Sequence, residues 1–216
     1  MAQIVIFDLD GTLLDTVGDL AASCNAILEQ FGYPTHEMDD YHQFVGNGIM
    51  RLVERAMPEA ERTPERVAEV RAKFVAHYTA NIDKHTTHYK GIVWLLEELQ
   101  RREISIAVAS NKFQDGTRKL IKRFFPQIRF AAVLGQRPDV PLKPSPAIVR
   151  EVLQITSYTP DKVIFVGDSG IDMLTAKAAG VKSVGVTWGF RSREELEQNG
   201  ANYIIDSPEM LLKLLD

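Results

Sequence analysis

The sequence predicts an α/β protein with a parallel sheet and one helical insert. Short apolar runs rich in β-branched residues recur along the chain, and they are continuous rather than alternating, as expected of strands buried on both faces. Helical patterns separate most of these runs, which is typical of parallel strands joined by crossover helices. One interval between runs is too long for a single crossover, and it indicates an insertion.

The sheet is predicted from six apolar runs. They are Ile4 to Phe7, Ile104 to Ala109, Phe130 to Leu134, Val163 to Val166, Ser183 to Val186 and Tyr203 to Ile205. Between them, apolar residues three or four positions apart predict helices near residues 93–99, 120–124 and 148–153, and a further helix is expected to stop at Gly180.

The insert is predicted between the first two strands, where about 95 residues separate runs that a βαβ unit would join in about 30. Two sets of apolar residues in this interval each share one helical face. They are Leu20, Cys24, Ile27, Leu28 and Phe31, then Val67, Val70, Phe74, Val75, Tyr78 and Ile82. We therefore expect a small helical domain over residues 15–88, inserted into a core formed by residues 1–14 and 89–216.

Composition and charge narrow the function classes. The 216 residues carry a formal net charge of −4, with 45% apolar and 25% charged residues, which argues against nucleic acid or an anionic membrane as a bulk partner. The apolar runs stop far short of the roughly 20 residues that cross a bilayer. With Cys24 as the single cysteine and no basic leader before the first strand, we expect a cytoplasmic protein without a membrane span.

Two carboxylates follow the first predicted strand directly. Asp8 and Asp10 lie two residues apart, hence on the same side of an extended chain, and Gly11 and Thr12 come next. Desolvated carboxylates are costly unless a cation compensates them, and open parallel sheets place their ligands at the carboxyl ends of strands. The spacing does not match a calcium loop, because glycine comes fourth rather than sixth. A solvated Asp-Gly turn remains the alternative.

Polar residues also follow the second and fourth strands. Ser110 and Asn111 would reach the same sheet edge as Asp8, where a hydroxyl and an amide can bind phosphate oxygens. Asp168 and Asp172 come after the fourth strand, and Asp168 would lie beside Asp8 if the two strands are neighbours, giving an oxygen-rich site suited to Mg²⁺. Each of these two motifs also fits an ordinary turn or helix cap.

Lys143 lies among three prolines that hold the backbone extended. It could counter the charge of a carboxylate nucleophile and of a transferring phosphoryl group, and a solvated loop lysine is the alternative. The run Gly-Asp-Ser-Gly at residues 167–170 also occurs around the nucleophile of secreted serine proteases. That alternative is disfavoured because no disulfide is possible and all five histidines fall in the insert.

Taken in order, DLDGT, SN, a lysine before PSP, and GDSGID resemble the four motifs of haloacid dehalogenase-type phosphatases. The resemblance spans Ile4 to Asp172 and implies a Rossmann-like core with a helical cap. It implies that Asp8 is the nucleophile, that Asp10 is the acid and base, and that Lys143 orients Asp8.

The same resemblance implies the ligands. Mg²⁺ would be bound by Asp8, the carbonyl of Asp10 and Asp168, with Asp172 acting on these ligands or through a coordinated water. Ser110, Asn111 and Thr12 are the candidates for binding the phosphate.

The segment Val45-Gly46-Asn47-Gly48 resembles the substrate-facing loop of phosphoglycolate phosphatase-like caps. Its amides could meet an anion at a helix N-terminus, which makes Gly46, Asn47 and Gly48 candidate substrate-binding residues. Arg51, about one turn into the following helix, could bind a substrate carboxylate, although an exposed helical arginine is the commoner case.

The leading hypothesis is a phosphatase that acts on a small phosphomonoester, with 2-phosphoglycolate as the best single guess. A sugar phosphomutase or a pyrophosphatase of the same superfamily, and a catalytically silent binding protein on the same fold, stay open. The sequence fixes neither the substrate nor the oligomeric state.

Overall fold

The computed structural model describes residues 2–215, and its centre is a six-stranded sheet. The strands are β1 Ile4–Phe7, β4 Ser105–Phe113, β5 Ala132–Gln136, β6 Val163–Gly167, β7 Lys182–Val186 and β8 Tyr203–Ile205. Their order is β5-β4-β1-β6-β7-β8, and every neighbouring pair is parallel. The predicted parallel α/β sheet is therefore confirmed, with β1 in the middle between β4 and β6.

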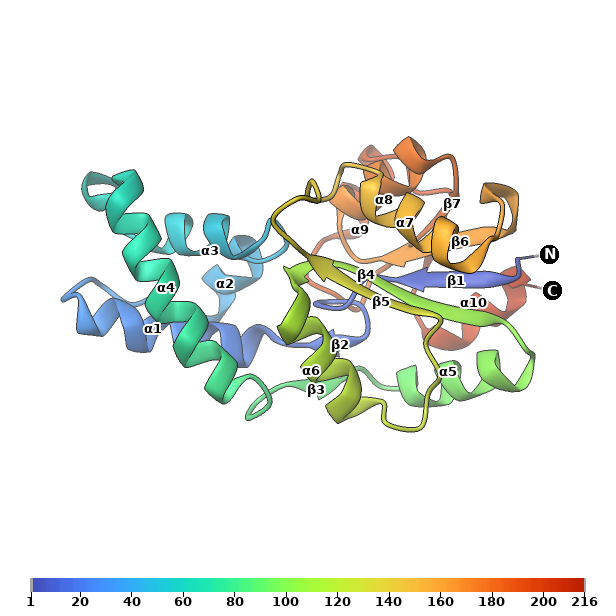
Figure 1. Cartoon of the computed structure of the whole chain (residues 1–216), viewed down its shortest axis with the longest axis horizontal. Coiled ribbons are helices and arrows are strands. Elements are labelled where there is room, and N and C mark those ends of the chain that lie inside the picture. The colour runs from blue at the N-terminus through green and yellow to red at the C-terminus, as the bar shows by residue number, and fades with distance from the viewer. Residues whose placement is uncertain (1, 216) are drawn as a thin grey trace.

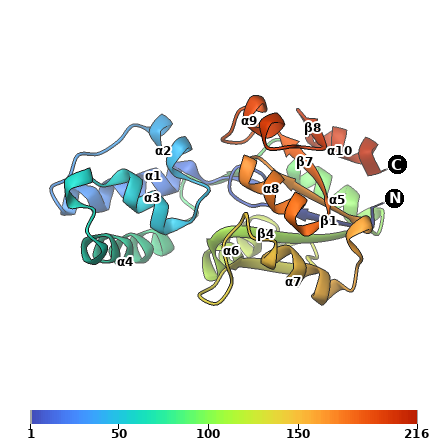
Figure 2. The same cartoon turned by 90° about the horizontal axis from the view of Figure 1, so that it is seen from above.

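Helices cover both faces of this sheet (Figures 1 and 2). They are α5 Ile92–Arg101, α6 Gln114–Phe124, α7 Ala147–Thr156, α8 Gly170–Ala179, α9 Arg193–Gln198 and α10 Pro208–Leu215, with a 3₁₀ turn at Pro160–Lys162. Val5 and Phe7 pack in one core cluster with α5, α6 and α10, whereas Ile4 and Ile6 pack in another with α7 and α8. This alternation is the two-residue period of a strand buried on both faces.

A group of helices lies apart from the sheet, at the left of Figure 1. It consists of α1 Val17–Gln30, α2 Met38–Phe44, α3 Ile49–Ala56, a 3₁₀ turn at Glu59–Glu61, and α4 Pro64–Asn81. Two short antiparallel strands, β2 Leu14–Asp15 and β3 Thr87–His88, join it to the sheet. A domain division at residues 15–88 stays a prediction, and we refer to α1–α4 as the helical insert.

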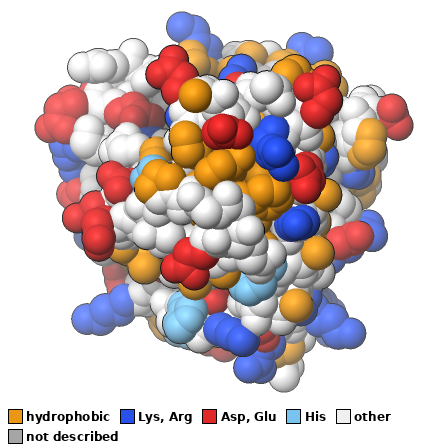
Figure 3. Space-filling view, turned by 90° about the vertical axis from the view of Figure 1, so that its left-hand side faces the viewer, with side chains coloured by type: hydrophobic (Ala, Val, Ile, Leu, Met, Phe, Trp, Pro, Cys, Tyr) orange, Lys and Arg blue, Asp and Glu red, His pale blue; other side chains and the backbone are white. Residues whose placement is uncertain are grey.

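The insert has a well-packed interior. The two apolar faces expected from the sequence belong to α1 and α4, which pack against each other, and Phe74 and Tyr78 of α4 are fully buried. On the face shown in Figure 3, acidic and basic side chains are interspersed around a small hydrophobic area. Across residues 2–215, no helix combines the length and apolar character needed to cross a membrane.

One strand differs from its expected bounds in a way that affects the site. The second long strand was expected to end at Ala109, but β4 continues to Phe113, and its register against β5 shifts between Ala109 and Phe113. Such an irregularity bends a strand and redirects its side chains. Ser110, Asn111 and Lys112 therefore lie in the irregular end of the strand rather than in a turn beyond it.

Candidate active site

The predicted catalytic residues gather at the carboxyl edge of the sheet. Asp8 follows β1, and its backbone N–H donates to the carbonyl of Val166 in the neighbouring β6, at 2.9 Å. Asp168 follows β6, and Ser110 and Asn111 come from β4 on the other side of β1. Parallel strands bring these ends together, which is why residues about 160 positions apart in the sequence share one site.

Lys143 is buried beneath this edge, between two carboxylates. Its Nζ lies 3.0 Å from Oδ1 of Asp8 and 2.7 Å from Oδ1 of Asp172. Only 4% of Lys143 is exposed, and burial alone would lower its pKa, but Asp172 and Asp8 raise that pKa above its ordinary value. The lysine is therefore a fixed positive charge at the base of the site, not a solvated loop residue.

The loop that carries Lys143 is fastened by Asn111. The Asn111 side chain accepts a hydrogen bond from the backbone N–H of Lys143 at 2.8 Å and donates to its carbonyl at 3.2 Å. It also donates to the carbonyl of Gly46 in the insert, at 3.1 Å. Because its amide is already engaged in this way, Asn111 holds the lysine loop rather than presenting a free side chain to phosphate.

Three buried carboxylates form a potential cation site. Asp8, Asp168 and Asp172 each offer an oxygen, and the three oxygens lie within 4.8 Å of one another. Burial, reinforced by Asp172 and Asp10, raises the pKa of Asp8 to about 6 despite the opposing charge of Lys143. Burial, reinforced by Asp172 and Asp8, raises the pKa of Asp168 to about 8.

Asp172 differs from the other two because three donor groups already contact its oxygens. It accepts from Lys143, and its Oδ2 accepts from the backbone N–H and the hydroxyl of Ser169, closing a capping box at the start of α8. Oδ1 of Asp8, in contrast, has the ion pair with Lys143 but no hydrogen bond of good geometry. A divalent cation held by oxygens of Asp8 and Asp168 would give Asp8 Oδ1 a further partner. It would also stabilise the ionised form of both carboxylates, whose pKa values are raised.

Asp168 is held by two hydrogen bonds and lies against two glycines that leave no room for a side chain. It accepts from the Thr12 hydroxyl at 3.2 Å and from the backbone N–H of Phe190 at 2.8 Å. A Cβ added to Gly11 would lie 2.3 Å from Asp168 Oδ2, and one added to Gly189 would lie 2.2 Å from its Cβ. Both glycines are therefore required by the close approach of two backbone segments to this carboxylate.

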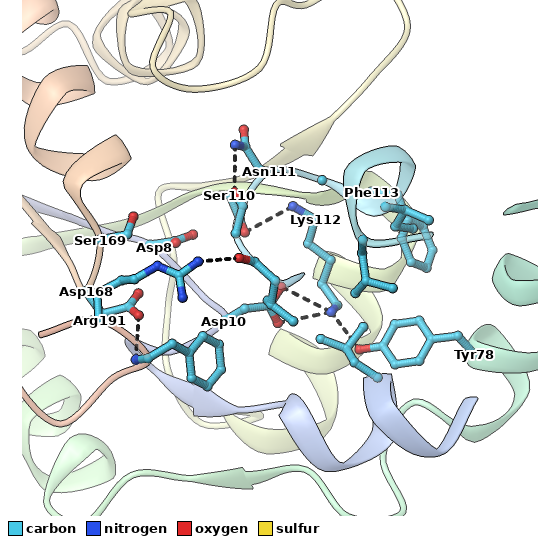
Figure 4. A pocket seen from close by; sticks show the side chains of 17 residues that line it. Asp8, Asp10, Tyr78, Ser110, Asn111, Lys112, Phe113, Asp168, Ser169 and Arg191 are labelled. Carbon is cyan, nitrogen blue, oxygen red and sulfur yellow. Dashed lines mark hydrogen bonds and ion pairs between the residues drawn. The ribbon is translucent and has the colours of Figure 1, made fainter. Parts of the chain in front are cut away.

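Asp10 points into the pocket and has three donor contacts (Figure 4). Thr16 donates to its Oδ1 at 2.7 Å, and Lys112 Nζ lies 3.0 Å from Oδ1 and 3.2 Å from Oδ2. The same Nζ donates to the hydroxyl of Tyr78 at 2.6 Å, across the boundary between sheet and insert. Sequence reasoning missed Lys112 and Tyr78, although Lys112 directly follows the Ser110-Asn111 pair.

The pocket lies between the sheet edge and the helical insert. The sheet side supplies Asp8, Asp10, Ser110, Asn111, Lys112, Phe113, Asp168, Ser169, Phe190 and Arg191, and the insert supplies Leu20, Val45, Gly46, Gly48, Ile49, Leu52 and Tyr78. Ser110 Oγ accepts from the backbone N–H of Lys112 at 3.2 Å, which leaves its own proton free to be donated.

Not every candidate reaches this pocket. Arg51 was expected to bind a substrate carboxylate, but its side chain is 63% exposed, pairs with Glu54 and is not among the residues that line the pocket. The reason is helix rotation, since Ile49 and Leu52 of α3 line the pocket and Arg51 lies off that face. Asn47 and the fully buried Thr12 are also absent from the lining. Thr12 contacts Asp168 instead of the pocket.

Arg191 is a second cation of the pocket, after Lys112, that the sequence did not single out. It follows β7 and donates to the carbonyls of His42 and Val45 in the insert, the second at 2.8 Å. The neighbouring Phe190 ring stacks on His42, with ring centroids 5.5 Å apart. This loop therefore connects Asp168, through the Phe190 N–H, to the segment of the insert that covers the pocket.

A buried aspartate-centred site at the carboxyl edge of a Rossmann-like parallel sheet, beneath a helical insert, defines the class of this protein. The chain belongs to the haloacid dehalogenase-like hydrolase family, whose sequence pattern matches residues 5–186. The resemblance seen in the four motifs is thus confirmed, and so is the fold class that it implied.

Similar proteins cover the whole chain. The chain is 32% identical to Phosphoglycolate phosphatase 1 of Pseudomonas aeruginosa, over 100% of this chain and 80% of the relative. It is 30% identical to a phosphoglycolate phosphatase of Aquifex aeolicus, over 99% and 97%. A crystal structure of a Lactobacillus delbrueckii subsp. bulgaricus protein superposes with a TM-score of 0.92 at 30% identity, over 99% and 98%.

Proposed function

We propose that this protein is a Mg²⁺-dependent phosphatase that hydrolyses a small phosphomonoester through an aspartyl phosphate on Asp8. The observation that carries the proposal is the convergence of Asp8, Asp168 and Lys143 in a buried cluster beside a pocket. A carboxylate nucleophile next to a fixed cation and a second carboxylate suits phosphoryl transfer, where charge must be neutralised as it moves.

The side chains of Asp8 and Asp168 and the carbonyl of Asp10 are the proposed magnesium ligands. Their oxygens are the donors that Mg²⁺ prefers. When bound, the ion would neutralise charge on the phosphoryl oxygens. Asp172, whose oxygens accept from the Lys143 ammonium and from two groups of Ser169, orients Lys143 and the start of α8 rather than binding the ion.

The chain's own residues divide the reaction into two steps. In the first, an oxygen of Asp8 bonds to phosphorus while the bond from phosphorus to the leaving oxygen breaks, and Asp10 gives that oxygen a proton. In the second, Asp10 removes a proton from water, which attacks phosphorus and frees phosphate and Asp8. Ser110 and Lys143 contact the phosphoryl oxygens, while Asn111 and Thr12 hold Lys143 and Asp168 in place.

For the substrate, 2-phosphoglycolate is the proposed choice, since the similar proteins of Pseudomonas aeruginosa and Aquifex aeolicus are named phosphoglycolate phosphatases. The space beneath the insert is lined by both acidic and basic side chains, which fits a small anionic ester. The proposed partner is thus a small phosphorylated metabolite in the cytoplasm. Nothing in the geometry of residues 2–215 favours a mutase, a pyrophosphatase or a silent binding protein.

A phosphate-release screen over small metabolites tests the proposal. We expect hydrolysis that needs Mg²⁺, stops with EDTA and is lost in Asp8→Asn, because an amide cannot accept the phosphoryl group. Asp161→Asn, which neutralises an exposed aspartate, is the matched control and should keep full activity. An active Asp8→Asn protein would refute the mechanism, and isomerised sugar phosphate without phosphate release would indicate a mutase.

A further inference from the structure

Lys112 is a buried cation whose donors are all engaged. Its side chain is 2% exposed, and its Nζ donates to both carboxylate oxygens of Asp10 and to the hydroxyl of Tyr78. A lysine ammonium has three donors and no acceptor, so none is left for a substrate. Although Lys112 lines the pocket, its geometry is that of a group that holds Asp10.

The contact fixes how the Asp10 carboxylate is turned. A single ammonium that spans both oxygens, at 3.0 and 3.2 Å, opposes rotation of the carboxylate about its last bond, and Thr16 adds a third contact at 2.7 Å. Proton transfer requires the acid to stay within hydrogen-bond reach of the leaving oxygen, so this orientation has a direct effect on rate.

Tyr78 connects this arrangement to the helical insert. It belongs to α4, is fully buried, stacks on Phe74 at 5.5 Å and meets the Phe113 ring edge-on at 6.3 Å. Its hydroxyl is 2.6 Å from Lys112 Nζ, and the ammonium also lies over its ring, 4.7 Å from the centroid. In Figure 4 Lys112 lies between Asp10 and Tyr78.

We propose that Lys112 is a positioning residue for Asp10, held in place by Tyr78 of the insert. The inference rests on the proposed function, because it assigns Asp10 the proton that the leaving oxygen receives as the bond from Asp8 to phosphorus forms. The insert thereby contributes to the chemical step without touching the reacting atoms.

Two esters of similar shape provide the test, phenyl phosphate and 4-nitrophenyl phosphate. The nitro group makes the departing phenolate more stable, so that ester depends less on a proton from Asp10. We expect Lys112→Met to lower kcat/KM on the order of 10²-fold for phenyl phosphate and about tenfold for the nitro ester, since general acid catalysis is worth 10² to 10⁴. Asp10→Asn should show the same pattern more strongly.

Lys119→Met is the matched control, because the exposed Lys119 of α6 also donates to α4, at the carbonyl of Thr79, and has no contact with Asp10. It should leave both rates unchanged. Tyr78→Phe keeps the ring and removes only the hydroxyl, so it tests the proposal even if Lys112→Met fails to fold, and we expect a smaller loss with the same preference.

Equal losses on the two esters, in Lys112→Met or in a folded Tyr78→Phe, would overturn the inference, because a substrate-binding or purely structural role does not depend on the leaving group. If the unaltered protein hydrolyses neither ester nor any metabolite of the screen, the proposed function fails, and this inference fails with it.

Discussion

The sheet edge and the helical insert differ in how tightly the chain fixes their functional side chains. At the edge, Asp8 and Asp168 follow directly from paired strands, and Lys143 is held between two carboxylates. In the insert, Gly46 and Gly48 meet the pocket but Arg51, only three residues further, does not. A residue directly after a strand is placed at a known edge of the sheet. In a helix, each further residue turns the side-chain direction by about 100°.

The groups that carry the chemistry belong to the sheet edge, whereas the insert covers the pocket. The charged side chains of the sheet edge are buried and form ion pairs with one another. Removing one of them therefore leaves the charge of its partners uncompensated. The insert is contacted instead through hydrogen bonds and ring contacts, such as those that Arg191 and Phe190 make to it. We therefore expect larger effects from changes at the edge than from changes at the insert.

The largest effect is expected for Lys143→Met. It leaves Asp8 and Asp172 buried without their cation, and breaking a buried ion pair by removing one partner costs about 3–5 kcal/mol. It also removes the positive charge that would lie beside the phosphoryl group in the transition state, so we expect kcat to fall on the order of 10³-fold. Urea unfolding and steady-state kinetics measure the two effects.

Lys162→Met provides the comparison for that variant, because Lys162 is 40% exposed and pairs with an exposed aspartate. It should change neither stability nor rate by much. Activity close to normal in a folded Lys143→Met protein would show that the buried charge is not needed for turnover.

A smaller effect is expected from magnesium on stability. Asp8 and Asp168 have folded-state pKa values of about 6 and about 8, above the ordinary aspartate value of 3.8. The folded state therefore binds more protons than the unfolded state between pH 4 and 8, and the metal-free protein loses stability as pH rises through this window.

Mg²⁺ competes with those protons, so it should raise Tm more at pH 8 than at pH 5. At 100 times its Kd the ion contributes about 2.7 kcal/mol, which corresponds to roughly 5–10 °C for a chain of this size. Differential scanning calorimetry with NaCl at matched ionic strength measures the shift, and Asp168→Asn should remove it. A larger shift at pH 5 would contradict the assigned site.

Sequence reasoning located the residues of the sheet edge because a motif that directly follows a buried parallel strand lies at the carboxyl edge of the sheet. It could not place side chains whose position depends on packing between distant segments. In the sequence, Lys112 is one more charged residue near a strand end, and Tyr78 is part of an apolar helical face. Their contact is evident only when the structure brings β4 and α4 together. Arg191 lies in a loop after β7, and its partners in the insert are 149 and 146 positions away in the sequence.

The smallest effect is expected for Arg191→Ala, with Arg51→Ala as its matched control. Removing Arg191 deletes charged hydrogen bonds to the carbonyls of His42 and Val45, each worth about 1.5 kcal/mol or more, so the segment over the pocket is less firmly held. We expect kcat/KM to fall about tenfold, since 1.4 kcal/mol is one factor of ten. Arg51→Ala removes only an exposed pair with Glu54 and should leave kcat/KM unchanged. Steady-state kinetics with the substrate found in the screen distinguishes the two variants, and a larger loss for Arg51→Ala would reverse the assignment and restore the expectation drawn from the sequence.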